Sequence, residues 1–421
     1  MIPFGPKTRY RIYTRARDYM AVTKDLLTGG ANRGNDVERL EKELALRLGV
    51  SDGICVPQGR VGIYLAVKAL IKPGQKVVLS PYTIADVINM VICAGGVPVF
   101  ADIDRPTTNI SAAEVERLMD SSTGAVMVTH LHGIPCDIEQ IAALCQARGV
   151  PLIEDVAQAF GAKLKAGYLG TFGDASIFSF GMYKNVTAFY GGFIATPKRD
   201  LAESIRKEMA PFPNHPLSSL LMKVCQALLT DVATWPPLFR ASVYWIFRYA
   251  YLHDISFINK TVTIELDTFR RNSIPQSYLC RFLPMQARMV LRQLDSVDAN
   301  TAVRIRHSRI YHEGLKDLKD LVIPPFKDDG SHVYNYFPIQ FRDRKKLVRW
   351  MMLYRRDLAV QHLKNCAALP SFAAESRDCP NAEATANQTI LLPNYPSYGE
   401  DQVRRNVRVI REFFSAGADR A

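Results

Sequence analysis

The chain has 421 residues, of which 48 % are hydrophobic, so it is long enough for two domains and too apolar to be mainly disordered. Its formal net charge of +12 fits a nucleic acid, an anionic membrane or a phosphorylated substrate. The sequence shows no helix-turn-helix, no zinc finger and no basic motif interleaved with aromatic residues, which argues against a nucleic acid partner.

Targeting segments and metal-binding spacings are not apparent in the sequence. The first twenty residues carry charge but no apolar signal region, and no run reaches the ~18 apolar residues of a membrane span. The eight cysteines are scattered, with no CxxC pair and no histidine at zinc-binding spacing. We therefore expect a cytoplasmic protein with reduced thiols and no metal site.

Residues 37–200 alternate between helical and strand-like segments, the pattern of a mostly parallel sheet covered by helices. The predicted helices include VERLEKELALRL, VGIYLAVKAL and IEQIAALCQARG, and the predicted strands are ICVP, VVLSP, VPVFADI, GAVMVTH, VPLIED, ASIFSF and GGFIAT. Apolar runs of this length suit strands that are buried on both faces. We predict an N-terminal segment and a large α/β domain over residues 1–210.

Residues 211–262 have a different composition from the segments on either side. Two helix-length apolar pieces, PFPNHPLSSLLMKVCQALLTDVATW and LFRASVYWIFRYAYLHDISF, are joined by the break at Pro236 and Pro237. Trp235 and Trp245 lie here among tyrosines and arginines, the composition of a helix in a bilayer interface. A helical hairpin buried on the protein itself or at a dimer contact would look the same. We assign residues 211–272 to this insert and keep both interpretations open.

Residues 273–421 predict a smaller α+β domain. LPMQARMVLRQLDSVDANTAVRIRHSRIYHEGL has the pattern of one long helix, and HVYNYFPIQF that of a strand. RKKLVRWMMLYRRDL and EDQVRRNVRVIREFF predict two further helices, the first of them basic.

Polar residues follow two of the predicted strands. Asp155 ends VPLIED, Ser179 belongs to ASIFSF, and Lys184 comes five residues later. Ligands of open α/β sheets collect at the carboxyl ends of strands. Asp155 alone could be a helix N-cap, Ser179 alone a turn hydroxyl and Lys184 alone a surface lysine. Together they match pyridoxal phosphate, because lysine forms a Schiff base with its aldehyde and a carboxylate keeps its ring nitrogen protonated.

The run VPLIEDVAQAFGAKLKAGYLGTFGDASIFSFGMYKN resembles the signature of the DegT/DnrJ/EryC1/StrS family of sugar aminotransferases, which have fold type I and use pyridoxal phosphate. The resemblance continues in QKVVLSPYTIADVINMVICAGGVPVFADID, HLHGIPCDIEQI, LPMQARMVLRQLDSV and ILLPNYPSY. It implies a homodimer with shared active sites that moves an amino group from glutamate or glutamine to a keto group of a sugar.

The resemblance also implies roles for individual residues. Lys184 matches the Schiff-base lysine, and Asp155 matches the partner of the ring nitrogen. Gln158 matches the residue near the phenolic oxygen of the ring, although an exposed polar residue in the first turn of a helix would have the same spacing. Ser179 and the turn at Gly59 match the phosphate contacts, the latter through backbone amides at a helix start.

Four contacts around the predicted cofactor, made by five residues, depart from the family pattern. They are Arg60 in place of threonine, Ile84 in place of the stacking aromatic with Tyr82 nearby, Phe189 and Tyr190 in place of glycine and glutamate, and Leu279 in place of the asparagine lent by the partner. Arg60 can pair with phosphate or lie exposed on its helix. We expect Phe189 and Tyr190 to contact the substrate, and the acceptor to be more apolar than usual or lipid-linked.

Alternatives to transamination remain open at the level of the sequence. The altered pocket is compatible with another pyridoxal phosphate reaction, such as dehydration or decarboxylation. It is also compatible with a non-catalytic, membrane-surface protein on an aminotransferase fold. His130 and His362 match histidines or segments of the family, but we expect structural or surface roles for them and assign them no catalytic one.

Overall fold

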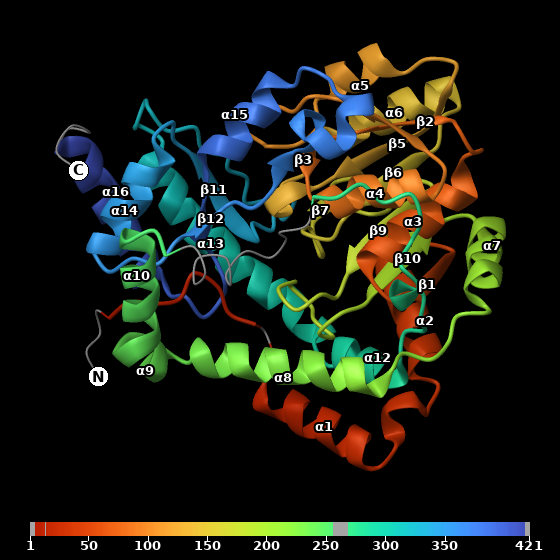
Figure 1. The fold of residues 1–421 in the computed structure, drawn as a ribbon, viewed down its shortest axis with the longest axis horizontal. Coiled ribbons are helices and arrows are strands. Elements are labelled where there is room, and N and C mark those ends of the chain that lie inside the picture. Colours follow the sequence, from red (N-terminus) through yellow and green to blue (C-terminus); the bar gives the residue numbers. More distant parts are fainter. Residues whose placement is uncertain (1–4, 13, 256–267, 417–421) are drawn as a thin grey trace.

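The computed structural model describes residues 5–12, 14–255 and 268–416. Residues 256–262, which belong to the predicted insert, lie outside the described part of the chain. Two folded regions are seen in Figure 1, one built on a large sheet and one on a small sheet, with the helices of the insert along one side.

The large sheet has seven strands in the order β1-β10-β9-β6-β5-β2-β4. β10 runs antiparallel to both of its neighbours, and the other neighbouring pairs are parallel. The strands are β1 (Asp52–Val56), β2 (Lys76–Leu79), β4 (Val97–Phe100), β5 (Thr123–Thr129), β6 (Leu152–Asp155), β9 (Ala175–Ser179) and β10 (Gly192–Thr196). All seven strands predicted from apolar runs are present, which confirms the mostly parallel α/β sheet.

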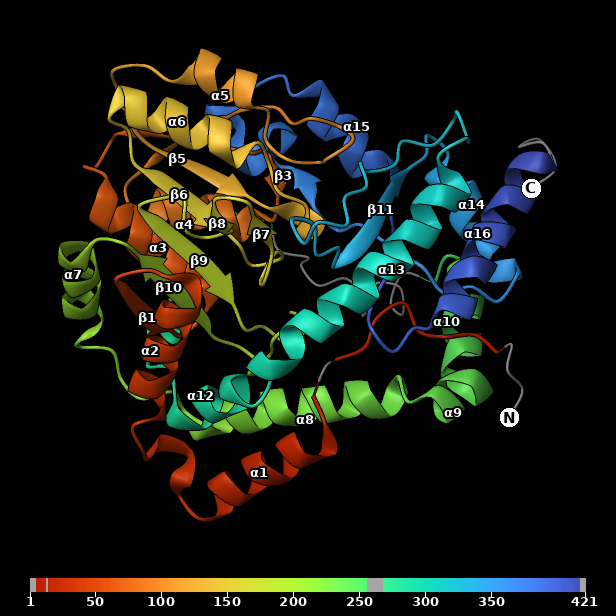
Figure 2. The same cartoon turned by 180° about the vertical axis from the view of Figure 1, so that it is seen from behind.

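Helices cover both faces of this sheet (Figures 1 and 2). They are α2 (Asp36–Leu48), α3 (Gly59–Leu70), α4 (Ala85–Cys93), α5 (Ala112–Leu118), α6 (Ile138–Arg148) and α7 (Arg199–Met209). α3 is apolar on most sides, because residues Val61 to Val67 are all buried. α2 is amphipathic and buries Leu40, Leu44 and Leu48. Two separate apolar cores result, one on each face of the sheet.

The smaller region contains a three-stranded antiparallel sheet in the order β11-β14-β12. Its elements are β11 (Tyr336–Gln340), α14 (Arg344–Leu353), β12 (Ala359–Val360), α15 (Pro380–Gln388), β14 (Thr389–Pro393) and α16 (Glu400–Ser415). Short strands connect it to the large sheet's region, since β13 (Lys364–Asn365) pairs with β3 (Tyr82–Thr83). A further hairpin is formed by β7 (Lys163–Leu164) and β8 (Gly167–Tyr168).

The single long helix predicted after residue 283 is wrong. The chain forms α12 (Pro284–Leu291), a turn at Leu294–Ser296, and then α13 (Val297–Leu315). The break follows from hydrogen bonds of Gln293. Its side-chain amide accepts a hydrogen bond from the backbone N–H of Thr187 at 3.1 Å and donates one to the Thr187 carbonyl at 2.7 Å. Helix periodicity continues through this point and gives no sign of the contact.

The insert forms α8 (Leu217–Ala233), α9 (Pro236–Leu238) and α10 (Tyr244–Leu252). The helices are interrupted between Ala233 and Pro236, beside the break predicted at Pro236 and Pro237. α8 buries Leu220, Val224 and Ala227 in the core of the large region. α10 is tied to α14, because the Tyr244 hydroxyl donates to the Met352 carbonyl at 2.8 Å. The inner side of the insert is therefore buried on the protein itself. Within the described residues, no helix combines the length and apolarity needed to cross a membrane.

The N-terminal segment runs across the smaller region before it enters α1 (Ala16–Leu27) (Figure 1). The Arg9 guanidinium donates from Nε to the Asp357 carboxylate at 2.9 Å. The Lys7 ammonium donates to the carbonyl of Ser397 at 3.0 Å. Residues from the two ends of the chain thus complete one folded region, and the division at residues 210 and 272 stays a prediction.

Candidate active site

The carboxyl ends of β6 and β9 meet at one edge of the large sheet. Asp155 is the last residue of β6 and Ser179 the last of β9, and Asp155 pairs with Ile177 across the two strands. Lys184 lies in the loop from β9 to β10, where its backbone N–H donates to the Gly181 carbonyl at 3.0 Å. The structure therefore brings Asp155, Ser179 and Lys184 together, as the parallel-sheet pattern requires.

Lys184 and Asp155 influence each other electrostatically. Burial lowers the pKa of the Lys184 amine, the Asp155 charge raises it, and the Arg60 charge lowers it again. Burial raises the pKa of the Asp155 carboxyl, while the Ala157 N–H and the Lys184 charge lower it. A lysine with a lowered pKa has a larger neutral fraction, and only the neutral amine is a nucleophile.

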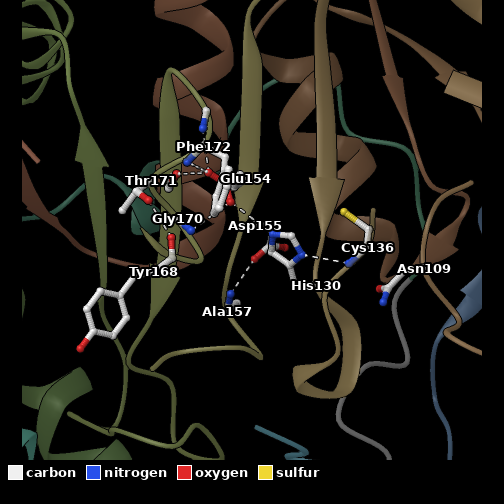
Figure 3. Close-up of polar contacts among 12 residues, drawn as sticks. Asn109, His130, Cys136, Glu154, Asp155, Ala157, Tyr168, Gly170, Thr171 and Phe172 are labelled. Carbon is white, nitrogen blue, oxygen red and sulfur yellow. Dashed lines mark hydrogen bonds and ion pairs between the residues drawn. The ribbon is translucent and has the colours of Figure 1, made fainter. Parts of the chain in front are cut away.

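Asp155 is 6 % exposed and is oriented by its own backbone turn. The Ala157 N–H donates to Asp155 Oδ1 at 2.9 Å, as Figure 3 shows. This is the short-range bond expected of an Asp just before a turn. The bond uses one oxygen and fixes the direction of the carboxylate.

The neighbouring Glu154 has a different role, because its carboxylate is buried among backbone donors (Figure 3). It accepts hydrogen bonds from the N–H groups of Gly170 at 2.9 Å, Phe172 at 2.8 Å and Gly173 at 2.8 Å. His130 Nε2 lies 3.3 Å from Glu154 Oε2, and His130 Nδ1 accepts from the Cys136 N–H at 3.3 Å. The second contact places the His130 proton on Nε2, facing Glu154. Both residues therefore fix the loops around the site.

Gly59 begins α3 and faces Ser179. A Cβ atom built on Gly59 would lie 3.2 Å from Ser179 Cβ, and one built on Gly192 would lie 2.8 Å from the Gly59 nitrogen. The first backbone N–H groups of a helix have no partner within the helix and attract anions. Gly59, Ser179 and the start of α3 therefore form a small anion-binding corner in which added side-chain atoms would crowd the backbone.

Arg60 follows in α3 and is held by residues from two other elements. Its guanidinium forms an ion pair with Asp86 of α4, and its Nη1 donates to the Tyr278 hydroxyl at 3.3 Å. Its guanidinium carbon also lies 5.4 Å from the centre of the Tyr278 ring. Leu279, next in the chain, is half-buried against the core of its own subunit. The Arg60 charge acts on the site, because it lowers the pKa of Lys184.

The residues predicted for the cofactor ring occupy different surroundings. Gln158 Oε1 accepts from the His132 N–H at 2.9 Å, and the Gln158 carbonyl accepts from Asn335 Nδ2 at 2.7 Å. Ile84 is half-buried and precedes α4 as its N-cap residue. Tyr82 is fully buried in β3 and belongs to the apolar core. Contacts of Gln158, Ile84 and Tyr82 with a cofactor ring stay predictions.

The loop after Lys184 is shaped by bulky residues. Phe189 has a positive φ of 67°, a conformation that favours glycine, and it stands where the family pattern has glycine. Its ring lies 6.0 Å from that of Tyr19, and the Tyr190 ring lies 4.4 Å from that of His215. The Tyr190 hydroxyl is buried, and no described residue supplies a hydrogen-bond partner for it. A substrate role for Phe189 and Tyr190 stays a prediction.

A small cavity is lined by the residues on either side of Lys184 in the chain and by the N-terminal segment. Its lining includes Tyr10, Arg11, Tyr183, Asn185 and Asn335. The rings of Tyr10 and Tyr183 are 5.0 Å apart. Asn185 Nδ2 and Asn335 Oδ1 are buried and have no hydrogen-bond partner among the described residues. Buried polar atoms of this kind are suited to a polar ligand.

Several residues of the site did not stand out in the sequence. Gln286 Nε2 donates to the Tyr190 carbonyl at 2.8 Å, and Gln293 holds Thr187, so two glutamines fix the loop after Lys184. Their spacing of seven residues on an apolar helix was the available signal. His362 did stand out in the sequence, with a structural or surface role expected, and it lies near the site, since burial and the Lys184 charge lower its pKa to about 4. Asp86 was missed because nothing local marks it as the partner of Arg60.

These residues fit pyridoxal phosphate as a resident cofactor. The half-buried Lys184 and the buried Asp155 would supply an amine and a carboxylate, and the corner of Gly59 and Ser179 would suit a phosphate. Among the described residues, no three His, Cys, Asp or Glu side chains gather to hold a metal ion. Fold and site together define a pyridoxal phosphate-dependent aminotransferase of fold type I.

Comparison with known proteins gives the family. The model of the DegT/DnrJ/EryC1/StrS aminotransferase family matches residues 13–218 and 263–411, and the chain belongs to this family. It is 28 % identical over 409 residues to the spore coat polysaccharide biosynthesis protein SpsC of Bacillus subtilis, covering 94 % of each chain. It is 28 % identical to a UDP-N-acetyl-3-dehydro-alpha-D-glucosamine 3-aminotransferase of Acidithiobacillus ferrooxidans, covering 90 % of this chain and 88 % of the relative.

The solved structures agree with the fold. An aminotransferase from Psychrobacter cryohalolentis superposes with a TM-score of 0.76 at 20 % identity, over 98 % of this chain and 99 % of the other. At this identity the likeness concerns the fold alone.

Proposed function

We propose that this enzyme moves an amino group from glutamate or glutamine to a keto group of a sugar or sugar-like acceptor that is nucleotide- or lipid-linked. The observation that carries the proposal is the joint placement of Lys184, Asp155 and Ser179 at one sheet edge beside Gly59. The names of relatives support a sugar acceptor, because one of them acts on a dehydrogenated UDP-N-acetylglucosamine.

In this proposal Lys184 is both the covalent anchor and the proton carrier. Pyridoxal phosphate, when bound, supplies an aldehyde carbon that joins an amine and a ring that withdraws electrons from the adjacent carbon. With the cofactor bound, Lys184 Nζ, whose pKa is lowered by burial, would take the proton from the substrate carbon that carries nitrogen and hold it for return. Asp155 holds the proton on the ring nitrogen, and its carboxylate is already oriented by Ala157.

The remaining predicted residues have binding roles in this proposal. Gly59, Arg60 and Ser179 hold the phosphate, and Gln158 orients the phenolic oxygen. Tyr82 and Ile84 are assigned to the face of the ring. Phe189 and Tyr190 contact the acceptor, and the buried Tyr190 hydroxyl is the group suited to bind it. These bulky residues favour an acceptor with an apolar part.

The proposal includes the assembly and location of the enzyme. A homodimer with shared active sites is proposed by analogy with the family, as is a cytoplasmic location. Membrane contact of residues 211–262, one of the two interpretations of this insert, belongs to the same proposal and concerns where the enzyme works, not what it catalyses.

The test is the absorbance of the purified protein with added pyridoxal phosphate. We expect a near-ultraviolet and visible band from lysine-bound cofactor, which Lys184→Ala removes and the control Lys165→Ala leaves unchanged, because Lys165 is an exposed residue. Glutamate or glutamine should shift the band. A colourless wild-type protein, or a band that survives in Lys184→Ala, would overturn the role of Lys184. A band that responds to no amino donor would favour dehydration or decarboxylation.

A further inference from the structure

Helix α8 has an outward apolar face that the rest of the described chain does not cover. Its inward residues Leu220, Val224 and Ala227 are buried. A second set of residues lies on an adjacent stripe of the helix and is exposed: Leu217, Leu221, Met222, Cys225, Leu228, Leu229 and Val232. Leu229 is 70 % exposed, and Trp235 at the end of the helix is 56 % exposed. Polar residues, including Lys223 and Gln226, occupy the third side.

Helix α1 extends this face. Both views show α1 beside α8 (Figures 1 and 2), and the Tyr19 hydroxyl donates to Asp231 Oδ2 at 2.6 Å between the two helices. Met20 and Leu27 point outward from α1, with exposed fractions of 67 % and 83 %. Exposed apolar residues in such number on two neighbouring helices mark a site of interaction. We call the exposed apolar residues of α1 and α8 the α1–α8 face.

The outward charges of these two helices are positive. The acidic residues of the helices have internal partners: Asp18 pairs with Arg292, Asp25 pairs with Arg288, and Asp231 accepts from Tyr19. Exposed cations remain on α1, namely Arg17 and Lys24, with Arg15 just before it, whereas Lys223 lies on the polar side of α8. Arg17 and Lys24 are seven residues apart and therefore lie on one side of α1, next to the stripe of Met20 and Leu27.

We infer that the α1–α8 face binds the surface of a membrane that contains anionic phospholipid. An apolar helix face bordered by cations, with a tryptophan at its end, is the combination that lies in a bilayer interface. Apolar side chains enter the acyl boundary, and each cation near an anionic surface adds attraction. The inference rests on the proposed membrane location and is independent of the proposed reaction.

A second copy of this chain is the competing occupant, and two observations argue against it. The family model matches residues up to 218 and resumes at 263, so most of α8 lies in a segment that the family's shared fold does not need. A second copy would also bring the same cations of α1 and α8 toward one another, on a chain whose formal net charge is +12. An anionic surface complements these charges.

The experiment uses the full chain with pyridoxal phosphate and sedimentation with vesicles. Vesicles of phosphatidylcholine mixed with phosphatidylglycerol should bind the protein, and pure phosphatidylcholine should bind it more weakly. Leu221→Glu/Leu228→Glu should lower the partition coefficient by about tenfold or more, because both changes place a charge in the lipid-facing stripe. The matched control is Ser219→Glu/Gln226→Glu, which adds the same charge to other sides of α8. Arg17→Gln/Lys24→Gln should reduce the preference for anionic vesicles.

Cofactor absorbance, melting temperature and molar mass of each variant accompany the binding data. Retained absorbance with lost vesicle binding supports the inference and leaves the proposed reaction intact. Absent absorbance with retained vesicle binding would instead overturn the reaction alone. Equal vesicle binding by the wild type and Leu221→Glu/Leu228→Glu overturns the inference. So does a wild type that ignores vesicles while Leu221→Glu/Leu228→Glu falls from dimer to monomer, since the face would then join two copies.

Discussion

Replacing Arg60 by alanine tests whether the departure at this position has become part of the phosphate site. The guanidinium follows Gly59 at the start of α3 and is fixed by Asp86 and Tyr278. A hydrogen bond to a charged group contributes about 1.5–3 kcal/mol. The Arg60 side chain is 34 % exposed, and its guanidinium already pairs with Asp86. Its hydrogen bond to a phosphate should therefore contribute the lower of these two energies. We expect pyridoxal phosphate to bind Arg60→Ala about tenfold more weakly, since 1.4 kcal/mol corresponds to a factor of ten.

A second readout of the same variant is the pH dependence of cofactor attachment. The Arg60 charge lowers the pKa of Lys184, so its removal should raise that pKa. A higher pKa leaves less neutral amine at a given pH, and the midpoint of attachment should therefore move to higher pH. Absorbance titrations with pyridoxal phosphate over a pH series measure both the affinity and the midpoint.

The control is Lys68→Ala, which removes one positive charge from the same helix. Lys68 pairs with the exposed Glu208 at 2.6 Å, far along α3 from Gly59. Asp86 keeps a cationic neighbour in Arg60→Ala, because Arg271 Nε lies 3.7 Å from its other oxygen, so the fold should survive. If Arg60→Ala and Lys68→Ala bind the cofactor equally well and share one pH midpoint, Arg60 has no part in the phosphate site.

Other predictions concern stability and the loop after Lys184. Glu154→Gln should lower the free energy of unfolding in urea by about 3 kcal/mol, because an NH2 group would face backbone donors; an unchanged midpoint would contradict this. Phe189→Gly removes the strain of a left-handed backbone, which stabilises by about 1 kcal/mol, but it also removes a ring that is 2 % exposed. The loss of the ring outweighs the relief of strain, so the free energy of unfolding in urea should fall by about 3 kcal/mol rather than rise. Burial lowers the pKa of His132 to about 3, so the native state lacks a proton that the unfolded state binds below about pH 6.5. Stability should therefore fall as the pH drops from 6.5, and His132→Asn should flatten that slope by up to ~1.4 kcal/mol per pH unit. Gln293→Ala should loosen residue 187 and raise hydrogen exchange of its N–H, while the exchange of β6 stays unchanged.

The sequence was sufficient for the large sheet and for the strand-end residues, since both depend on local patterns. Buried parallel strands are short apolar runs, and the carboxyl end of each run is known once its boundaries are known. The placement of Asp155 and Lys184 at one edge of the sheet could therefore be predicted without knowing any contact between distant segments. The insert's break was equally local, because Pro236 cannot continue a helix.

Contacts between distant segments were not predictable in this way. The break between α12 and α13 depends on Gln293 meeting Thr187, which is 106 positions away. Arg60 pairs with Asp86 on another helix. An exposed Arg60 side chain without this partner would be equally consistent with the sequence. Phe189 was recognised as unusual in size, but its positive φ is visible only in the folded loop.

The N-terminal segment has a consequence for the order of folding. Residues 7 and 9 are made long before their partners Ser397 and Asp357, which lie 390 and 348 positions further along the chain. Contacts of such long sequence separation form late, since their loop must close before they contribute. The N-terminal segment must therefore wait for residues 357 and 397 before it can complete the smaller region.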